Sequence, residues 1–261
     1  MAYALGVTLS RGRSACLISD SGAPIAITEA WLIGQPDDLA PPAFGRRYVQ
    51  MPECSIDYCL SNAGISFVDL DAIVFCDPAL SVAGTTREGS VADCVLRLPF
   101  SPQSRMLMID PMLAHAHGVH HLSGFHEAAI VVTARDHNMA LRGGYTAYGP
   151  VTSLGHVELF KASEGSIFRV ARASCGAPET LRKQQSIEDM LLGLSAQALL
   201  KTGCDRLCVA GDVVPDTASG IRTRNALNAR EVFVQPVTND GTALGAALYG
   251  WRHEQLPSLR D

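Results

Sequence analysis

Two kinds of hydrophobic pattern follow one another along the chain. Short apolar runs bounded by turn residues predict strands, and apolar residues that recur every three or four positions predict helices. The weakly patterned segments 32–50 and 77–104 are expected to be loops or irregular structure. In the first half, these patterns predict strands over 3–9, 14–19, 24–31 and 71–76, and a helix that begins at Pro52 and ends at Gly64.

The second half repeats this theme. Its clearest helix is expected over 186–201, where apolar residues fall at offsets 0, 3, 4, 7 and 11 from Ile187. Ser186 and Asp189 are in positions to form a capping box at its start. The other predicted elements are strands over 127–134, 139–147, 155–161, 206–210 and 231–234, and helices around 216–228 and over 241–252.

Each half therefore consists of strands followed by alternating helices and strands. Two such halves predict a duplicated α/β fold with two mixed sheets flanked by helices, as in the actin-like (ASKHA) superfamily. We expect an N-terminal subdomain over 1–108 and a C-terminal subdomain over 109–261. The duplication is inferred from the order of elements, because the sequence shows no strict repeat.

Composition and charge argue against a nucleic-acid-binding, membrane-bound or secreted protein. The 261 residues are 47% apolar and 18% charged, which provides ample material for a core. A formal net charge of −5 gives no electrostatic attraction to nucleic acid or to an anionic membrane. No apolar run approaches the ~20 residues of a membrane span and no signal sequence is visible, so we expect a cytoplasmic protein. The eight cysteines include no CxxC pair and are expected to be buried thiols in a reducing compartment.

Histidines are concentrated in one segment, since six of the eight lie between positions 115 and 137. On a helix, His117 and His121 would stand one turn apart on one face, a spacing that chelates metal ions. The alternative is a polar helix face whose histidines form hydrogen bonds or face water. The sequence leaves both interpretations open.

A second candidate segment begins at the turn formed by residues 239–241. Thr242 would lie in the first turn of the following helix, whose unpaired N–H groups favour a phosphate. Gly245 and the neighbouring alanines would let that helix approach a sheet closely. The alternative is an ordinary strand-to-helix turn with a small-residue packing face.

A third candidate segment follows the strand predicted over 206–210. Gly211 permits close approach by a ligand, whereas the carboxylate of Asp212 would repel a phosphate. A plain turn is the alternative. The chain has no Walker A, GxGxxG or GxSxG sequence, which weighs against P-loop NTPases, Rossmann dehydrogenases and serine hydrolases. The candidate nucleotide-binding residues are Gly211, Asp212, Gly241, Thr242 and Gly245.

Several segments match one enzyme family. They are Gly6-Val-Thr with Ser14-Ala-Cys-Leu-Ile and Asp20-Ser-Gly, residues 56–75, Leu113-Ala-His115-Ala, residues 123–131, Leu207-Cys-Val-Ala-Gly211 and Asn239-Asp-Gly-Thr-Ala-Leu-Gly-Ala-Ala. They resemble the O-carbamoyltransferases of antibiotic and nodulation-factor biosynthesis, whose catalytic domain is shared with the tRNA threonylcarbamoyl-transferring enzyme. The last segment, similar to a DxGTALGAA signature, is the most specific.

The resemblance implies particular chemistry. In the family, a metal ion held by histidines and aspartates positions carbamoyl adenylate and polarises its carbonyl. A separate YrdC-like domain makes that adenylate, and this chain has no counterpart to it. The implied cofactors are therefore a divalent metal, iron or zinc, and an adenine nucleotide or carbamoyl adenylate. The implied metal ligands are His115, His117, His121, Asp136 and Asp240.

The chain departs from the family motifs at many positions. The family's HHD reads Arg11-Gly12-Arg13 here, so no catalytic histidine can be assigned. A large central piece, in which the family builds substrate contacts, is also absent. The other departures are Pro111 and Met112 for the first two histidines of HHLAHA, Glu29-Ala30-Trp31 for EER, Ala134 and Asn239 for two aspartates, and Asp212 for the second glycine of AGG.

Three functions follow from these observations. The first is a shortened, non-catalytic carbamoyltransferase-family subunit that pairs with a complete homologue, in an isologous pseudo-dimer through residues 110–125, or with itself. The second is an active metal-dependent transferase that moves a carbamoyl group from an activated donor to a small-molecule hydroxyl. The third is an ATPase or sugar kinase in which Arg11 and Arg13 contact phosphates. No nucleic-acid or membrane partner is expected.

Overall fold

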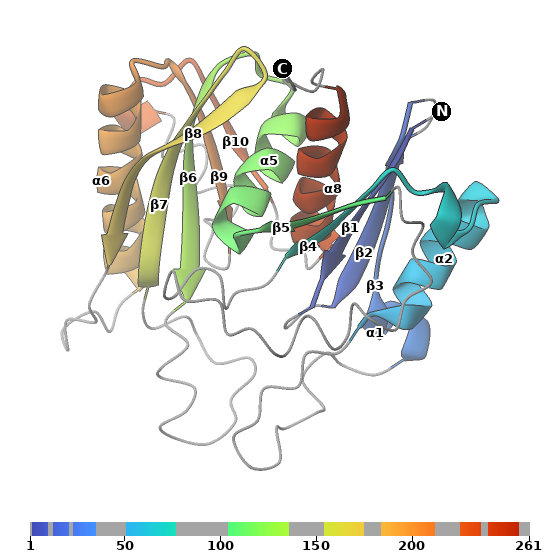
Figure 1. The fold of residues 1–261 in the computed structure, drawn as a ribbon. Coiled ribbons are helices and arrows are strands. Elements are labelled where there is room, and N and C mark those ends of the chain that lie inside the picture. Colours follow the sequence, from blue (N-terminus) through green and yellow to red (C-terminus); the bar gives the residue numbers. More distant parts are fainter. Residues whose placement is uncertain are drawn as a thin grey trace. The chain divides into compact units, whose positions relative to one another are not determined.

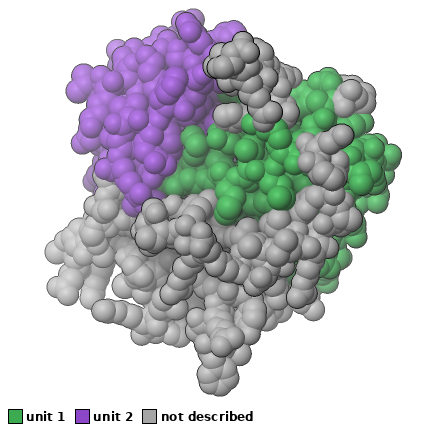
Figure 2. Space-filling model, in the orientation of Figure 1, with its two compact units in different colours: residues 1–114, 238–261 green, residues 115–237 purple. Residues whose placement is uncertain are grey.

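The computed structural model describes nine stretches of the chain (Figure 1), which fall into two compact units (Figure 2). Unit 1 comprises residues 1–114 and 238–261, and unit 2 comprises residues 115–237. Each unit is built on a five-stranded mixed sheet. The described stretches are 2–9, 13–20, 23–34, 51–76, 104–135, 154–174, 184–211, 225–235 and 240–255.

The sheet of unit 1 has the strand order β3-β2-β1-β4-β5. The first three strands are antiparallel, as predicted, and β4 and β5 run parallel to β1. The parallel step from β1 to β4 requires a crossover, and α2 lies within it. The bounds are β1 (Tyr3–Thr8), β2 (Ser14–Ser19), β3 (Ile25–Thr28), β4 (Ala72–Cys76), β5 (Arg105–Ile109) and α2 (Glu53–Ala63).

Alternate residues of β1 face opposite layers. Leu5 and Val7 pack against α2, whose buried Ile56, Cys59 and Leu60 repeat at helical spacing. The predicted end of this helix is confirmed, because Gly64 has a φ of 67° and its N–H donates to the carbonyl oxygen of Ser61 at 3.1 Å. Apolar periodicity and one glycine therefore define this layer.

Helix α8 (Asp240–Gln255) covers the other face of the same sheet (Figure 1). A Cβ atom at Gly6 would overlap the backbone of Ala243 and Ala247. One at Gly250 would instead approach Ala4, at the start of β1. Helix α8 therefore runs antiparallel to β1, and its N-terminus lies at the carboxyl ends of β1 and β4.

The chain division differs from the predicted boundary between 108 and 109. Residues 238–261, expected in the C-terminal subdomain, belong to unit 1, because α8 packs on the sheet of unit 1. Helix α5 (Pro111–Ser123) begins in unit 1, and from His115 onward its residues belong to unit 2. A long-range contact, which local patterns do not encode, decides the division.

The third predicted strand is too long, since β3 ends at Thr28 and the chain continues as α1 (Glu29–Ile33). The carboxylate of Glu29 is buried and accepts hydrogen bonds from the N–H groups of Cys54 (3.2 Å) and Ser55 (2.7 Å) at the start of α2. These bonds satisfy two of the unpaired N–H groups of the first helical turn. The contact with α2 explains why a strand-like sequence becomes helical.

Unit 2 has the strand order β10-β9-β6-β7-β8. Strands β6, β7 and β8 are antiparallel, and β9 and β10 run parallel to β6. Helix α6 packs on one face through Leu191, Leu194 and Ala198, which confirms its predicted apolar stripe. The bounds are β6 (Ala128–Arg135), β7 (Leu154–Ser163), β8 (Ser166–Ser174), β9 (Arg206–Gly211), β10 (Glu231–Val234) and α6 (Gln184–Thr202).

The remaining predictions have mixed outcomes. Strands β5 and β8 were not predicted. The strand expected over 139–147 lies outside the described residues, as does most of the helix expected around 216–228. No helix in the described stretches has the length and apolar character that crossing a membrane requires.

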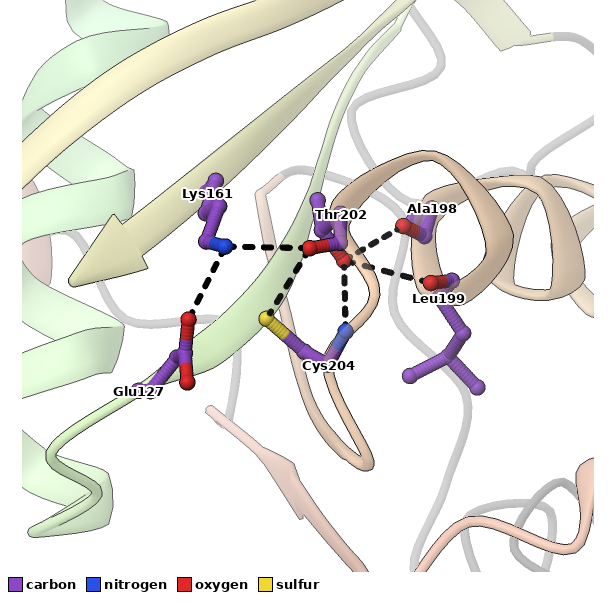
Figure 3. Close-up of polar contacts among 6 residues, drawn as sticks. All are labelled: Glu127, Lys161, Ala198, Leu199, Thr202 and Cys204. Carbon is purple, nitrogen blue, oxygen red and sulfur yellow. Dashed lines mark hydrogen bonds and ion pairs between the residues drawn. The ribbon is translucent and has the colours of Figure 1, made fainter.

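Polar contacts close the C-terminal end of α6 (Figure 3). The Lys161 Nζ donates to the carbonyl oxygen of Thr202 at 3.1 Å and forms an ion pair with Glu127 at 2.9 Å. A cation at this position complements the negative end of the helix dipole. The hydroxyl of Thr202 donates to the carbonyl oxygen of Ala198 at 2.7 Å and accepts from the N–H of Cys204 at 3.3 Å.

Gly245→Ala is expected to lower the free energy of unfolding by about 1–3 kcal/mol, because the added Cβ would overlap the carbonyl oxygen of Ala114 in α5. Urea denaturation measures the change. The matched control is Gly193→Ala in α6, where a Cβ would meet no atom within 4 Å. That control should gain up to about 1 kcal/mol of helix propensity. Equal effects of the two substitutions would contradict the close α8–α5 contact.

Candidate functional site

Helix α5 carries the predicted metal-binding histidines. Its first turn is capped by Asp110, whose carboxylate accepts the N–H of Met112 at 2.7 Å. His117 is buried, with 7% of its surface exposed, whereas His121 is exposed to solvent. His115 is half-buried. The i,i+4 pair is therefore present on a helix, but its members have different environments.

The described residues do not assemble a metal site by themselves. Among them, no group of three or more histidine, cysteine, aspartate or glutamate side chains could hold a metal ion. Asp136 and the side chain of Asp240 lie outside the described residues, so the complete predicted ligand set stays a prediction. Met112, which replaces the second histidine of the family motif, is buried at 3% exposure and packs in the protein interior.

Among the predicted nucleotide-binding residues, Gly241 and Thr242 are buried in the first turn of α8. The N–H groups of this turn point toward the carboxyl ends of β1 and β4, as a helix N-terminus directs them. Their partial positive charge favours an anion there. The structure therefore places Gly241 and Thr242 in the first turn of a helix, as predicted, and phosphate binding there stays a prediction.

Thr8 lies at the same end of unit 1 and was missed by sequence reasoning. It is the last residue of β1 and, by strand alternation, shares the α8-facing side with Gly6. Its hydroxyl is buried, with the residue 4% exposed, and has no hydrogen-bond partner among the described residues. A signal existed in the sequence, because Thr8 is the only polar side chain in the apolar run that forms this strand.

Unit 2 has a comparable feature at the carboxyl ends of its parallel strands. Gln235 directly follows β10 and is 4% exposed, and its amide oxygen has no partner within the described part of the chain. The backbone N–H of Gln235 donates to the carbonyl oxygen of Val209 at 2.9 Å. Ligands of open α/β sheets bind at the carboxyl ends of strands. Among the described residues, a buried polar atom without a hydrogen-bond partner therefore lies at this edge of the sheet in each unit.

Gly211 and Gly245 have structural reasons to be glycine. Gly211 has a φ of 112°, and a Cβ there would overlap the backbone of Thr133 in β6. At Gly245 a Cβ would overlap Ala114 of α5. Gly211 belongs to unit 2, whereas Gly241, Thr242 and Gly245 belong to unit 1. Asp212 lies outside the described residues.

The buried cysteines of the described chain do not supply a reactive thiolate. Four of the six described cysteines are buried, as expected, whereas Cys54 is exposed and Cys204 is half-buried. Burial raises the pKa of the Cys59 thiol to about 12 and that of the Cys208 thiol to about 12. Both thiols are therefore neutral at physiological pH.

The chain is similar to several solved structures over nearly its whole length. The chain is similar to a ROK hexokinase from Thermus thermophilus, with a TM-score of 0.56 and 12% identity over 97% of this chain and 100% of that one. It is also similar to YeaZ from Pseudomonas aeruginosa (TM-score 0.49, 12% identity, 97% of this chain and 93% of that one). A third is the ethanolamine utilization protein EutJ from Carboxydothermus hydrogenoformans (TM-score 0.49, 13% identity, 96% and 90%).

No family model and no curated protein sequence matches the chain. At 12% identity, the likeness to the hexokinase concerns the fold alone. The chain has the duplicated actin-like α/β fold, and the predicted fold class is confirmed.

Thr8→Val is expected to leave the free energy of unfolding unchanged or to raise it by about 1 kcal/mol, because it removes a buried hydroxyl with no partner among the described residues. Urea denaturation without added ligand measures the change. The matched control is Thr202→Val, which removes a hydroxyl with bonds at 2.7 and 3.3 Å and should cost about 1 kcal/mol. Equal losses in the two variants would indicate that Thr8 is hydrogen-bonded within the protein.

Proposed function

We propose that this chain is a shortened member of the carbamoyltransferase family that works beside a complete partner subunit in the O-carbamoylation of a natural product or metabolite. In this proposal it acts in the cytoplasm and does not itself catalyse the transfer. The sequence resemblance supports the family, and the replaced motif positions support the loss of catalysis.

One observation carries the non-catalytic part of the proposal. Pro111 and Met112 stand where the family motif has its first two histidines, so His115 has lost the histidine one helical turn before it, and Met112 is buried in the core. A buried methionine is a packing residue, since its thioether fills apolar space. The different environments of His117 and His121 add to this argument, because chelation requires two ligands that face one ion.

The chain keeps features that suit an anionic ligand. In the proposed complex, the hydroxyl of Thr8 and the N-terminal turn of α8 hold the anionic group of an activated carbamoyl donor or an adenine nucleotide. The buried hydroxyl donates to an anionic oxygen, and the helix N–H groups around Gly241 and Thr242 donate to others. Binding of the donor is thereby separated from transfer, which the partner performs.

The alternative is an active carbamoyltransferase, which the retention of His115 in the family register favours. A bound metal would supply Lewis-acid chemistry. The described residues do not form its site, so we assign no step to it.

The first test combines the purified chain with a complete carbamoyltransferase encoded in the same genome. A stable complex in size-exclusion chromatography with light scattering, and substoichiometric metal in this chain, are expected. The chain alone should show no carbamoyl transfer, because its metal motif is replaced. Near-stoichiometric iron or zinc that is lost in both His115→Ala and Asp240→Asn, with turnover by the chain alone, would overturn the proposal in favour of the alternative.

The second test concerns the ligand. AMP, a stable mimic of the adenylate donor, is expected to stabilise the wild type by ~2.7 kcal/mol at a hundredfold excess over Kd. Thr8→Val should lose most of this stabilisation while staying as stable as the wild type without ligand. Thermal unfolding with and without AMP measures both. Equal stabilisation of Thr8→Val and the wild type would exclude Thr8 from the ligand site.

A further inference from the structure

An apolar surface is exposed on unit 1. Its residues are the exposed Trp31, Leu32 and Ile33 of α1 and Tyr58 of α2, and we name them together the α1–α2 platform. The two helices contact each other (Figure 1). Trp31 is 84% exposed. Exposed apolar residues are ordinary when they are scattered, but a cluster around a tryptophan is typical of protein interfaces.

The platform is held rigidly. Glu29, two residues before Trp31, is 4% exposed and fastens α1 to the first turn of α2. Its carboxylate accepts from the N–H of Ser55 at 2.7 Å and from the hydroxyl of the same residue at 2.7 Å, and also from the N–H of Cys54. Hydrogen bonds to a charged group are worth more than neutral ones. A pre-organised surface loses little conformational entropy when a partner binds.

The charged side chains in the described parts of the chain that form α1 and α2 are acidic. Glu53 and Asp57 are exposed on α2, one turn apart. Residues 23–34 and 51–76 contain no lysine or arginine. The negative field raises the pKa of the exposed Cys54 thiol, mainly through Glu29, with Asp57 and Glu53 contributing less. The exposed face of α2 beside the platform is therefore acidic, and the nearby described cation is Arg13, whose carbonyl oxygen accepts the N–H of Glu29 at the start of α1.

We infer that the α1–α2 platform docks a different protein chain, one that receives Trp31 in an apolar pocket bordered by lysine or arginine side chains. A second copy of this chain bound through the same surface would bring Glu53 and Asp57 close to their own copies, and like charges at close range repel. An anionic membrane is disfavoured for the same reason. The inference rests on the proposed function only for the partner's identity, which would be the complete carbamoyltransferase.

The test compares two exposed apolar residues. Trp31→Ser should weaken binding of the complete carbamoyltransferase about tenfold or more, because a central tryptophan contributes much of an interface's affinity. The matched control is Leu200→Ser, because Leu200 is 85% exposed on α6 of unit 2. The Kd of this variant for the carbamoyltransferase should stay near the wild-type value. Glu53→Gln with Asp57→Asn should weaken binding and reduce its dependence on salt. Isothermal titration calorimetry at two salt concentrations measures all three.

The outcomes separate this inference from the proposed function. If the wild type binds the carbamoyltransferase and Trp31→Ser binds equally well, the proposed function stands and the platform is excluded. If the wild type does not bind, the proposed partner is wrong. A second experiment then replaces Trp31 or Leu200 with the photo-cross-linking residue p-benzoylphenylalanine and cross-links each variant to its neighbours in the source cells. A cross-link from position 31 alone that Glu53→Gln with Asp57→Asn abolishes supports the platform. No cross-link, equal cross-links from both positions, or a cross-link to a second copy overturns it.

Discussion

The contact between the backbones of α8 and β1 is the constraint on which unit 1 depends. Gly6 allows this contact because any side chain there would overlap Ala243 and Ala247, and Gly245 allows a second contact with α5. The last helix of the chain thereby covers the sheet that the first strand begins. Its N-terminus lies at the carboxyl end of β1, the end at which Thr8 is buried. The packing of this unit and the proposed anion site thus depend on the same contact.

This double role affects how the retained Gly-Thr-Ala-Leu-Gly-Ala-Ala segment is interpreted. Gly245 and the alanines are explained by the close packing of α8, and a chain that had lost its chemistry would still need them to fold. Gly211 is likewise explained by its contact with Thr133. The motif therefore supports the fold more strongly than it supports catalysis, and the argument for function has to come from polar groups that packing does not require.

Local patterns predicted the elements that bury one apolar face, such as α2, α6 and the central strands. They missed α1, because the buried bonds of Glu29 to α2 come from residues more than twenty positions away. They also missed the edge strands β5 and β8. Exposed apolar residues such as Met106 and Phe168 interrupt the alternation of buried apolar and exposed polar residues that marks a strand. The division of the chain and the environments of His117 and His121 depend on long-range packing. For the same reason, the sequence marks Thr8 as a polar residue in an apolar strand but does not show that its hydroxyl has no hydrogen-bond partner among the described residues.

Thr8 gives the sharpest physical argument for a retained ligand. Burying a hydroxyl without a partner costs about 1–3 kcal/mol, and valine has nearly the same shape without this cost. A subunit with a purely structural role would be more stable with valine at this position. An anionic oxygen that accepts from the hydroxyl would offset the penalty, and the N-terminus of α8 supplies the complementary partial charge. The proposed loss of catalysis and the proposed anion site are therefore compatible in one chain, if the subunit binds the donor and leaves the transfer to its partner.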